Sequence, residues 1–431
     1  MDNFIIQGGT PLTGTTEASG AKNAALPLLA ASILAENTVV YHHIPHLRDV
    51  STMLTLLARQ GADVEIDDKG RVCVDTTSMN QPIAPYDLVK TMRASALVLG
   101  PLVARFGEAT VSLPGGCAIG ARPIDMHLKG LEAMGASIDV THGNIRAEAP
   151  CGLHGAHITF DQVTVTGTEN LMMAASLAKG ETILENAARE PEVVNLADSL
   201  KRMGASINGD GTDKINISGV SQLNGSDLKV ISDRIEVGTY LTAGLITGGE
   251  VKVTNATPDS LDAFLARLRE AGAIVESGDD WISCKSDGKL DAVNIHTSPH
   301  PGFPTDLQAQ FMALMCTARG SSIVSETIFE NRFMHVQELR RMGANIDMDG
   351  HIAVIKGVDH LLAAPVMATD LRASASLVLA GLAAEGETRI SRVYHIDRGY
   401  ERIEEKLRNL GASIDRVGNS PELTKEEVSF G

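Results

Sequence analysis

One short block of residues occurs six times in this chain, and its spacing restricts the folds that the chain can adopt. Each copy reads Gly-Ala-x-Ile or Gly-Ala-x-Val, and successive copies lie about 70 residues apart. The copies begin at Gly61, Gly135, Gly204, Gly272, Gly343 and Gly411. Because this interval exceeds the common solenoid periods, we expect each copy to close a unit that contains several helices and strands.

The residues on either side of each block predict an amphipathic helix that is followed by a strand. Helix-like segments with Lys or Arg near their ends precede the block, as at 263–270 and 336–341. The glycine suits the left-handed position that ends a helix, and the basic residues complement the negative helix end. After the block, alternating apolar and polar residues, as at 136–140, predict a strand.

Each unit also contains a second predicted helix, which is apolar on nearly every face. Segments 94–103, 171–178 and 373–380 consist largely of Ala, Ser, Leu, Val and Met. A helix without a polar face has to be buried on all sides. A glycine and a strand-like segment follow these helices. We therefore expect each unit to contain a buried helix, a strand, an amphipathic helix and a strand, with at least one further strand.

Six such units exceed what one hydrophobic core usually holds, which favours two similar domains. The chain has 431 residues, of which 43% are hydrophobic, enough for two or three cores. We predict an α/β fold of two domains, with three helix/strand units in each and a cleft between them. The polar, glycine-containing run 221–232 is the candidate hinge.

The charge of the chain argues against polyanionic macromolecules as partners. Its 37 Lys and Arg against 54 Asp and Glu residues give a formal net charge of −17, and no long basic run offsets it. We expect no nucleic acid partner and no membrane insertion. Because the first residues lack an export signal and the apolar run 24–35 is too short to span a bilayer, the expected location is cytoplasmic. The sequence does not indicate an oligomeric state.

The cysteines are scattered, and their pattern is typical of reduced thiols. There are five, an odd number, without CxxC spacing. This pattern indicates no zinc site, and we expect neither a metal nor a cofactor. Cys73, Cys151, Cys284 and Cys316 are interpreted as inert packing residues.

The fifth cysteine, Cys117, lies in a loop that differs from the surroundings of the other four. Pro and Gly residues surround it within 113–123, and Arg122 follows five residues later. Such a segment cannot hold a regular helix or strand, so the thiol is expected on a mobile loop. A nearby guanidinium favours thiolate, which suits proton transfer or covalent chemistry. On loop context alone, the alternative of a small hydrophobe beneath a turn stays open.

The residues at the start of the buried helices form a further pattern. In every unit this position carries ionisable or polar side chains: Lys22 and Asn23, Arg93, Thr168 to Asn170, Arg234 and Glu236, Thr305 and Asp306, and Asp370 and Arg372. The threonine and aspartate residues among them are also candidate N-caps, and the sequence leaves this open. Cations at a helix N-terminus are locally unfavourable, so Lys22, Arg93 and Arg372 indicate an anionic ligand. If the buried helices are parallel, their ends form two faces across a cleft that suits a polyanionic ligand.

Several blocks together resemble the enolpyruvyl transferases, and among them the UDP-N-acetylglucosamine 1-carboxyvinyltransferases. The matching blocks are residues 20–24, 114–123, 301–306, 329–335, 370–375 and 395–400. The resemblance runs nearly end to end, and it implies two similar inside-out α/β domains, each with three units around buried parallel helices. By this resemblance, the first domain comprises 21–230, the second comprises 1–20 with 231–418, and 419–431 are a flexible tail.

The resemblance implies transfer of the enolpyruvyl group of phosphoenolpyruvate to the 3′-hydroxyl of UDP-N-acetylglucosamine, with release of phosphate through a tetrahedral ketal. This is the first committed step of peptidoglycan precursor synthesis. The catalytic residues it implies are Cys117 as general acid, Asp306 beside the sugar hydroxyl, Lys22 and Arg398. In the family the epoxide fosfomycin alkylates the loop cysteine, which implies Cys117 as its target.

Two sets of binding residues follow from the same resemblance. Phosphoenolpyruvate carries a phosphate and a carboxylate, which fixed cations and bidentate arginines recognise. The residues implied for it are Lys22, Asn23, Arg122, Arg332, Arg372 and Arg398. The residues implied for UDP-N-acetylglucosamine are Asn23, Arg93, Arg122, Pro123, Ile124, Asp125, Met126, Gln162, Val163, Thr164, Val165, Asp306 and Ile328.

Two other functions stay open. A sister enzyme of the same fold transfers the enolpyruvyl group to shikimate 3-phosphate, but it uses no loop cysteine, so Cys117 argues against it. The other is a catalytically silent relative that binds a UDP-sugar. The joint presence of Cys117, Asp306 and five cations favours an active enzyme.

The remaining ionisable residues near the matching blocks are interpreted as structural. We expect His127, His335 and His395 to be hydrogen-bonded core residues. Asp49 and Glu190 could line the cleft, but single carboxylates of this kind are more often structural.

Overall fold

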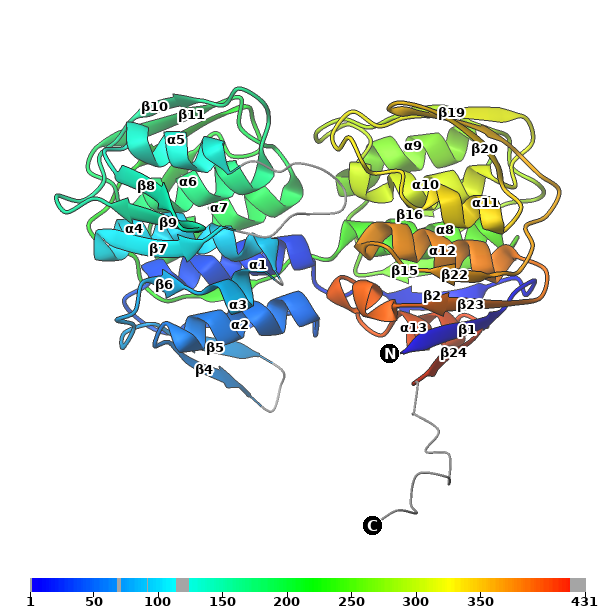
Figure 1. Ribbon diagram of the computed structural model, residues 1–431, viewed down its shortest axis with the longest axis horizontal. Coiled ribbons are helices and arrows are strands. Elements are labelled where there is room, and N and C mark those ends of the chain that lie inside the picture. The colour runs from blue at the N-terminus through cyan, green and yellow to red at the C-terminus, as the bar shows by residue number, and fades with distance from the viewer. Residues whose placement is uncertain (1, 68–70, 91, 114–123, 419–431) are drawn as a thin grey trace, which may run out of the picture.

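The computed structural model describes residues 2–67, 71–90, 92–113 and 124–418, and it consists of two domains side by side (Figure 1). The described residues form six four-stranded sheets, three in each domain. Each sheet contains the strand that follows one Gly-Ala block. The structure thus confirms the predicted α/β fold with six repeated units.

The third unit of the first domain shows how each unit is built. Its elements are β10 (His157–Thr159), α6 (Val165–Ser176), β11 (Glu181–Glu185), α7 (Pro191–Met203), β12 (Ser206–Asn208) and β13 (Lys214–Ser218). The buried helix α6 connects the parallel strands β10 and β11, while β11 and β12 both pair antiparallel with β13. The unit therefore has the expected buried helix, strand, amphipathic helix and strand, and two further strands.

The other two units of the first domain repeat this order with small changes. The first unit contains α1 (Lys22–Ala31), η1 (Ser32–Leu34), β3 (Val39–His42), α2 (Arg48–Arg59), β4 (Asp63–Ile66), β5 (Val72–Asp75) and β14 (Asp227–Lys229). The second contains β6 (Ile83–Ala84), α3 (Tyr86–Val89), η2 (Arg93–Val98), α4 (Leu99–Phe106), β7 (Glu108–Ser112), α5 (Asp125–Ala133), β8 (Ser137–Thr141) and β9 (Asn144–Glu148).

The second domain repeats the pattern and includes the N-terminal strands. Its first unit contains β2 (Thr13–Glu17), α8 (Arg234–Ile246), β15 (Glu250–Thr254), η3 (Pro258–Leu261), α9 (Asp262–Glu270), β16 (Ile274–Ser277) and β17 (Trp281–Lys285). Its second contains β18 (Ile295–His296), η4 (Thr305–Leu307), α10 (Gln308–Met315), β19 (Ser321–Ser325), α11 (Val336–Arg341), β20 (Asn345–Asp349) and β21 (Ile352–Lys356). Its third contains β1 (Asn3–Gln7), β22 (Pro365–Met367), α12 (Leu371–Ala383), β23 (Glu387–Ser391), η5 (Val393–Arg398), α13 (Ile403–Asn409) and β24 (Ser413–Val417).

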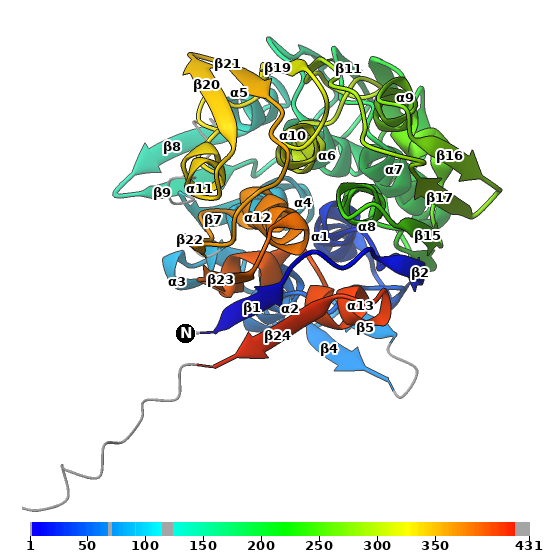
Figure 2. The same ribbon diagram turned by 90° about the vertical axis from the view of Figure 1, so that its right-hand side faces the viewer.

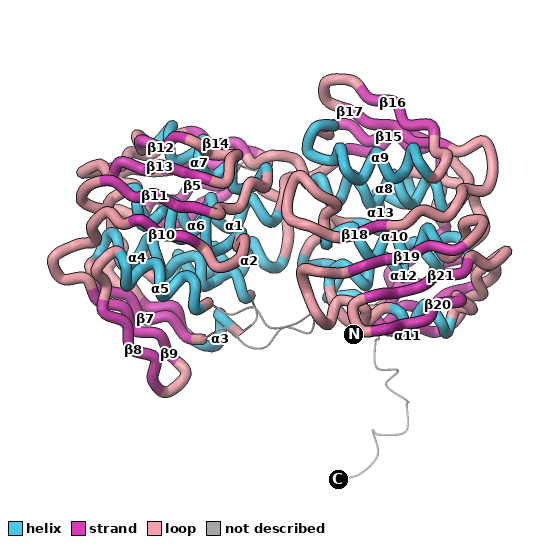
Figure 3. Tube along the Cα trace, turned by 90° about the horizontal axis from the view of Figure 1, so that it is seen from above, coloured by secondary structure: helices cyan, strands magenta, loops and turns pink. Residues whose placement is uncertain are grey.

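The apolar helices lie inside each domain and the sheets lie around them (Figure 3). In the second domain α8, α10 and α12 pack against one another, and Figure 2 shows them nearly end-on among the strands. Small residues allow such close packing of helices, also between α4 and α6 in the first domain. At Gly100, for example, a Cβ atom would lie 2.5 Å from Oδ1 of Asn170, and the Gly100 N–H donates to that oxygen at 2.7 Å.

The glycine of the repeated block ends the amphipathic helix, as the sequence predicts. Gly204 follows α7 with φ of 112°, a left-handed conformation that costs little without a Cβ atom. The glycines of the other five blocks also have positive φ. This shared conformation turns the chain from the helix into the next strand.

One predicted helix is divided in the structure. The segment 94–103 was expected as one helix, but the chain forms the 3₁₀ helix η2 over Arg93–Val98 before α4 begins at Leu99. Pro101 has no N–H group, and proline is best accommodated in the first turn of an α-helix, whereas in the interior, as at Pro27 in α1, it removes a helix hydrogen bond. The α-helix therefore begins shortly before this proline.

Two antiparallel segments connect the domains. The Ala21 N–H donates to Ile231 O at 2.7 Å, and the Asp233 N–H donates to Ser19 O at 2.8 Å. The run 221–232, expected as the hinge, includes β14, which pairs parallel with β3 in the first domain. One hydrophobic cluster contains residues from 21 to 230, and the other contains residues from 4 to 18 and from 235 to 414. Every helix in the described parts of the chain is too short or too polar to span a lipid bilayer.

Candidate active site

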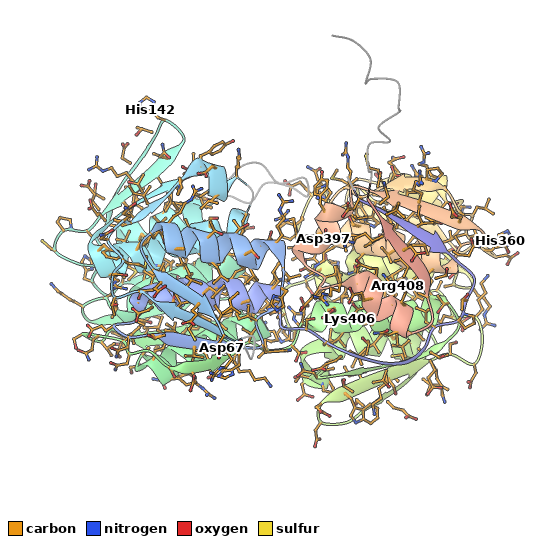
Figure 4. All side chains as sticks on the ribbon, turned by 90° about the horizontal axis from the view of Figure 1, so that it is seen from below. Asp67, His142, His360, Asp397, Lys406 and Arg408 are labelled. Carbon is orange, nitrogen blue, oxygen red and sulfur yellow. The ribbon has the colours of Figure 1, made fainter. Side chains whose placement is uncertain are left out.

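Asp49 joins cations from both domains. It lies in the first turn of α2, and its side chain is 4% exposed. Its Oδ2 lies 3.3 Å from Nζ of Lys22, the first residue of α1. Its Oδ1 lies 2.9 Å from Nε of Arg398, the last residue of η5 in the second domain. Figure 4 shows the neighbouring Asp397 on the side of the second domain that faces the first.

Asp306 is the centre of a second group at the same interface. It lies in η4, at the start of the buried helix α10. Its Oδ1 lies 2.6 Å from Nη2 of Arg332, and its Oδ2 lies 3.3 Å from Nε of Arg372. Nδ2 of Asn23, from the first domain, lies 3.5 Å from the same Oδ2. Lys22 and Asn23 are neighbours on α1, so the two groups form one cluster, which we call the anion cluster: Lys22, Asn23, Asp49, Asp306, Arg332, Arg372 and Arg398.

Local contacts position the arginines of this cluster. Oδ1 of Asp370 accepts hydrogen bonds from the N–H groups of Arg372 and Ala373 at 2.9 and 3.0 Å, so it caps α12 and sets Arg372 in the first turn. Oγ1 of Thr305 accepts a hydrogen bond from Nη1 of Arg332 at 2.9 Å. Arg332 is thereby held beside η4.

Burial and the opposite charges act together on the protonation of the cluster. Burial lowers the pKa of Lys22; Asp49 partly offsets this, and Arg372 and Arg398 lower it further. Burial alone would raise the pKa of Asp49, but Lys22 and Arg398 hold it below its usual value. Burial alone would lower the pKa of Arg372, but Tyr400 and Asp306 outweigh it and raise that pKa. Asp49 and Arg372 are therefore charged at neutral pH.

One donor of this cluster has no hydrogen-bond partner within the part of the chain that the structure describes. Arg372 is 3% exposed, and its Nη1 has no hydrogen-bond partner among the described residues. A buried guanidinium N–H without an acceptor is costly, because it loses its hydration without replacement. The arrangement is suited to an oxyanion that would complete it.

Carboxylates also compensate the cations at the helix N-termini. Lys22 pairs with Asp49, and Arg372 pairs with Asp306. Nε of Arg234, the first residue of α8, lies 3.0 Å from Oε1 of Glu192. The expectation that these cations need an anionic ligand was therefore incomplete. Their positions are explained partly by carboxylates that lie far away in the sequence.

The candidate N-caps differ in whether their side chains cap a helix in the structure. Asp370 caps α12 with two side-chain hydrogen bonds, whereas the Asp306 carboxylate contacts the arginines Arg332 and Arg372. Thr168 is not a cap, since α6 begins one turn earlier, where Thr164 Oγ1 accepts from the Gly167 N–H at 3.2 Å. The Thr168 hydroxyl donates to Thr164 O at 2.8 Å and accepts from the Ala188 N–H at 3.0 Å.

Most of the residues implied for the nucleotide sugar lie on the first domain, and two of the set, Asn23 and Asp306, belong to the anion cluster. Ile124 is the N-cap of α5, Asp125 and Met126 begin it, and 162–164 precede α6, which Val165 begins. Helices α5 and α6 pack together, and Lys129 Nζ lies 3.3 Å from Asp161 Oδ2. Ile328 lies on the second domain, where its N–H donates to Glu326 Oε1 at 2.9 Å.

Part of the expected site lies outside the described residues. These parts are Cys117, Arg122, Pro123 and the side chain of Arg93, which begins η2. The expected flexible tail, 419–431, also lies outside them. Within the described residues, no group of three or more His, Cys, Asp or Glu side chains is arranged to hold a metal ion.

The other cysteines differ from one another. Cys284 and Cys316 are buried, and burial raises the pKa of each thiol to about 12, which suits inert packing residues. Cys151 is exposed, so its interpretation as a packing residue was wrong. It follows the strand β9 at the surface, where a short loop precedes the next unit.

The histidines agree only in part with the expectation of hydrogen-bonded core residues. His127 is 2% exposed, and its Nδ1 lies 2.9 Å from Nδ2 of Asn170. His335 is 1% exposed, and its Nε2 lies 3.2 Å from the Met312 sulfur. His395 is only half-buried, against the ring of Tyr394.

The sequence analysis interpreted Asp49 as a structural carboxylate, and in the structure it pairs with cations from both domains. Its position in the first turn of an amphipathic helix, on the buried side, was visible in the sequence. Its contact with Arg398 was not, because 349 residues separate the two. Glu190 likewise contacts the other domain, since its Oε1 accepts from the His300 N–H at 3.3 Å.

A cavity of about 580 Å³ lies between the domains on the hinge side. Ile231 and Ser232 of the connection line it, together with Arg189, Arg234 and His300. None of the residues implied for the substrates lines it among the described residues. It is therefore distinct from the anion cluster.

Comparison with known proteins agrees with the fold. The chain matches the EPSP synthase (3-phosphoshikimate 1-carboxyvinyltransferase) family over residues 6–407. It is similar to the enolpyruvyl transferase NikO from Streptomyces tendae, with 25% identity, a TM-score of 0.87, and coverage of 96% of this chain and 99% of NikO. Two structures of EPSP synthase from Acinetobacter baumannii share the fold at 20% and 19% identity, with TM-scores of 0.76 and 0.75; each covers 97% of this chain and 100% of the synthase. Because the family match spans most of the chain, this protein belongs to the EPSP synthase family of enolpyruvyl transferases.

Proposed function

We propose that this protein transfers the enolpyruvyl group of phosphoenolpyruvate to the 3′-hydroxyl of UDP-N-acetylglucosamine and releases inorganic phosphate. The observation that carries the proposal is the anion cluster, in which Lys22, Arg332, Arg372 and Arg398 surround Asp306 and Asp49 at the domain interface. Membership of the enolpyruvyl transferase family supports the reaction class. The role that follows is the first committed step of peptidoglycan precursor synthesis, in the cytoplasm.

The charges of the cluster complement phosphoenolpyruvate. This substrate carries a phosphate and a carboxylate on three carbon atoms, and guanidinium groups bind both kinds of oxyanion with two parallel hydrogen bonds. We assign Arg332, Arg372, Lys22 and Arg398 to these anions, with Arg122 from the loop. Among the described residues Nη1 of Arg372 has no hydrogen-bond partner, which supports this assignment, since an oxyanion would satisfy it.

The reaction that we assign to the site has two steps. In the first, the sugar oxygen bonds to C2 of phosphoenolpyruvate, its proton passes to Asp306, and the Cys117 thiol donates a proton to the methylene carbon C3. In the second, the bond between C2 and the phosphate oxygen breaks, phosphate leaves with the proton held by Asp306, and C3 returns a proton to the Cys117 thiolate as the double bond is restored. The contact of the Asp306 carboxylate with Asn23 from the opposite domain supports its assignment as the group that orients the hydroxyl.

For the acceptor we propose the residues that the resemblance implies. Residues 124–126 begin α5, and 162–165 lead into α6, so N–H groups of two helix N-termini lie on the side of the first domain that we assign to the diphosphate. Asn23 and Asp306 would contact the sugar. Arg93, Arg122, Pro123 and Ile328 complete the set.

One alternative has a specific observation in its favour. The matching family is described as 3-phosphoshikimate 1-carboxyvinyltransferase, so shikimate 3-phosphate is the rival acceptor. The loop cysteine in the sequence favours the UDP-sugar. A protein that binds a UDP-sugar without turnover is the second alternative.

Phosphate release separates these functions. Purified protein with phosphoenolpyruvate is expected to release phosphate when UDP-N-acetylglucosamine is added, and to form a product heavier than the sugar nucleotide by one enolpyruvyl group. Release with shikimate 3-phosphate alone would assign the rival acceptor. Binding of the UDP-sugar without any release would contradict the enzymatic proposal.

A further inference from the structure

A buried polar cluster lies in the core of the second domain, next to Arg372. Its members are Thr239 on α8, Gln310 on α10, and Tyr400, two residues after η5. The Tyr400 hydroxyl lies 3.0 Å from Thr239 Oγ1 and 3.1 Å from Gln310 Nε2. Each of the three residues is at most 2% exposed. Three different repeat units therefore meet at one phenol oxygen.

The donors and acceptors of this cluster orient the Tyr400 hydroxyl. The Thr239 hydroxyl donates its proton to Ile235 O at 2.8 Å, so its oxygen is left to accept. Gln310 Nε2 can only donate, and it contacts both Thr239 Oγ1, at 3.2 Å, and the Tyr400 oxygen. The Tyr400 proton is therefore directed to Thr239. With its proton and its position both determined, the tyrosine ring is rigidly held.

The guanidinium of Arg372 lies over this ring. The Arg372 Cζ lies 5.4 Å from the centre of the Tyr400 ring, within the range of a cation–π contact. Asp306 holds one edge of the guanidinium through Nε, at 3.3 Å. Nη1 is left without a partner among the described residues. The Tyr400 side chain and Asp306 thus hold the guanidinium, while Nη1 has no hydrogen-bond partner among the described residues.

We propose that Tyr400, held by Thr239 and Gln310, is a positioning residue that orients Arg372 toward an oxyanion of phosphoenolpyruvate. This inference rests on the function proposed above. An arginine side chain loses rotamer entropy when it binds a ligand, so a guanidinium that is ordered before the ligand arrives binds it more tightly. Tyr400 does not touch the reacting atoms; it acts through Arg372.

The substitution Tyr400→Phe tests this role, and the chain offers a matched control. Tyr240 on α8 is equally buried, bonds Glu236 Oε1 at 3.2 Å, and has Lys406 Nζ 5.8 Å above its ring, but it does not contact Arg372. We expect Tyr400→Phe to raise the KM for phosphoenolpyruvate by about threefold to tenfold, while kcat and the KM for the acceptor change by less than about twofold. Tyr240→Phe is expected to leave the KM for phosphoenolpyruvate unchanged, although it lowers the melting temperature similarly.

A double-mutant cycle tests whether the effect passes through Arg372. In an Arg372→Lys background the planar guanidinium is absent, so Tyr400→Phe should raise the KM for phosphoenolpyruvate by less than about twofold further. If Tyr400→Phe does not fold, Thr239→Val takes its place, because it leaves the ring in position and removes the acceptor of the Tyr400 proton. Its expected effect is a smaller rise in the same KM.

The outcomes separate this inference from the proposed function. Wild-type turnover with an unchanged KM for phosphoenolpyruvate in Tyr400→Phe would overturn the role of Tyr400 and leave the function standing. A rise in both KM values, matched by Tyr240→Phe, would also overturn it. A wild-type protein that neither binds nor consumes phosphoenolpyruvate would overturn the function, and the inference with it.

Discussion

At the scale of single residues, the same carboxylate chemistry serves two purposes at the domain interface. Asp49 is nearly buried and joins Lys22 to Arg398, whereas the Asp306 side chain is 25% exposed and contacts Arg332 and Arg372. The buried pair holds cations in place. The more exposed carboxylate is accessible to a substrate, which is why we assign the hydroxyl contact to Asp306.

The first prediction concerns Cys117. We expect Cys117→Ala to lower kcat by at least about 100-fold, because the variant lacks the proposed acid, while UDP-N-acetylglucosamine still binds. Steady-state kinetics and isothermal calorimetry measure the two effects. Fosfomycin is expected to add to Cys117 alone in a peptide map. The exposed Cys151 serves as the control, and a label on Cys151, or full turnover in Cys117→Ala, would contradict the assignment.

The second prediction concerns Glu169, which is 1% exposed and has an Oε1 without a partner among the described residues. Burial raises its pKa well above the ordinary value of 4.5, and Glu192 and Glu190 raise it further. Because the folded-state pKa is the higher one, this group favours the folded state at low pH, and that contribution is lost as the pH rises through the folded-state pKa.

We therefore expect Glu169→Gln, which resembles the protonated side chain, to raise the melting temperature by about 2 °C or more at pH 8. At pH 5 the melting temperatures of variant and wild type should agree. Calorimetry at both pH values measures the difference. The exposed Glu181→Gln is the control, with no pH-dependent change expected. An equal shift at both pH values would show that Glu169 is ionised in the folded protein.

At the scale of elements, the buried helices begin in different ways although the units repeat. Thr164, Asp233 and Asp370 cap α6, α8 and α12 with side-chain hydrogen bonds. The helices α4 and α10 instead follow the 3₁₀ helices η2 and η4. The start of each helix decides where the next side chains point. Within the anion cluster, Arg372 lies in the first turn of α12, so its direction depends on the cap at Asp370.

The third prediction concerns the cap of α12. Asp370→Ala removes the acceptor of two N–H groups, which we expect to lower the free energy of unfolding by about 1 kcal/mol. The KM for phosphoenolpyruvate should rise as well, because the first turn that carries Arg372 loses its anchor. Denaturant unfolding and kinetics measure both. Asp370→Asn keeps a side-chain oxygen and should behave nearly as the wild type; equal effects of the two variants would contradict a capping role.

At the scale of the whole molecule, contacts at separate places hold the two domains together. Asp49 pairs with Arg398, Glu192 pairs with Arg234, and Asn23 contacts Asp306. The polypeptide itself crosses between the domains at Ser19–Ala21 and Ile231–Asp233. Anionic ligands would compete for the same cations, so substrate binding and the arrangement of the domains are expected to be coupled.

The fourth prediction concerns the Asp49 pair. Asp49→Asn leaves Lys22 and Arg398 without their carboxylate, which we expect to cost about 3 kcal/mol of stability and to increase the radius of gyration of the ligand-free protein. Wild-type protein should show the same expansion only as the pH falls below the ordinary Asp value of 3.8, because the folded-state pKa of Asp49 is lowered. Small-angle scattering measures the expansion.

The control for this experiment is Asp198→Asn, which removes an exposed carboxylate that pairs with Lys201 within α7. It should change neither stability nor size. An Asp49→Asn variant with the wild-type radius of gyration and melting temperature would show that the pair contributes nothing to the contact between the domains.

Much of the fold could be predicted because its signals are local. Each Gly-Ala block ends a helix at a left-handed glycine, and each small, apolar segment can only be a buried helix. Predictions failed where a local signal competed with another. Pro101 delayed the start of α4, and Thr164 instead of Thr168 began α6, since either threonine could serve as a cap.

The sequence by itself determined the repeated unit, its helix ends and the chemical types of the candidate site residues, because helix periodicity, glycine conformation and charge act over a few residues. Tertiary structure alone decided which carboxylate meets which cation, as with Asp49 and Arg398, 349 residues apart. It also placed β1 between β23 and β24. Such pairings depend on how complete units pack against one another, and no local pattern specifies that.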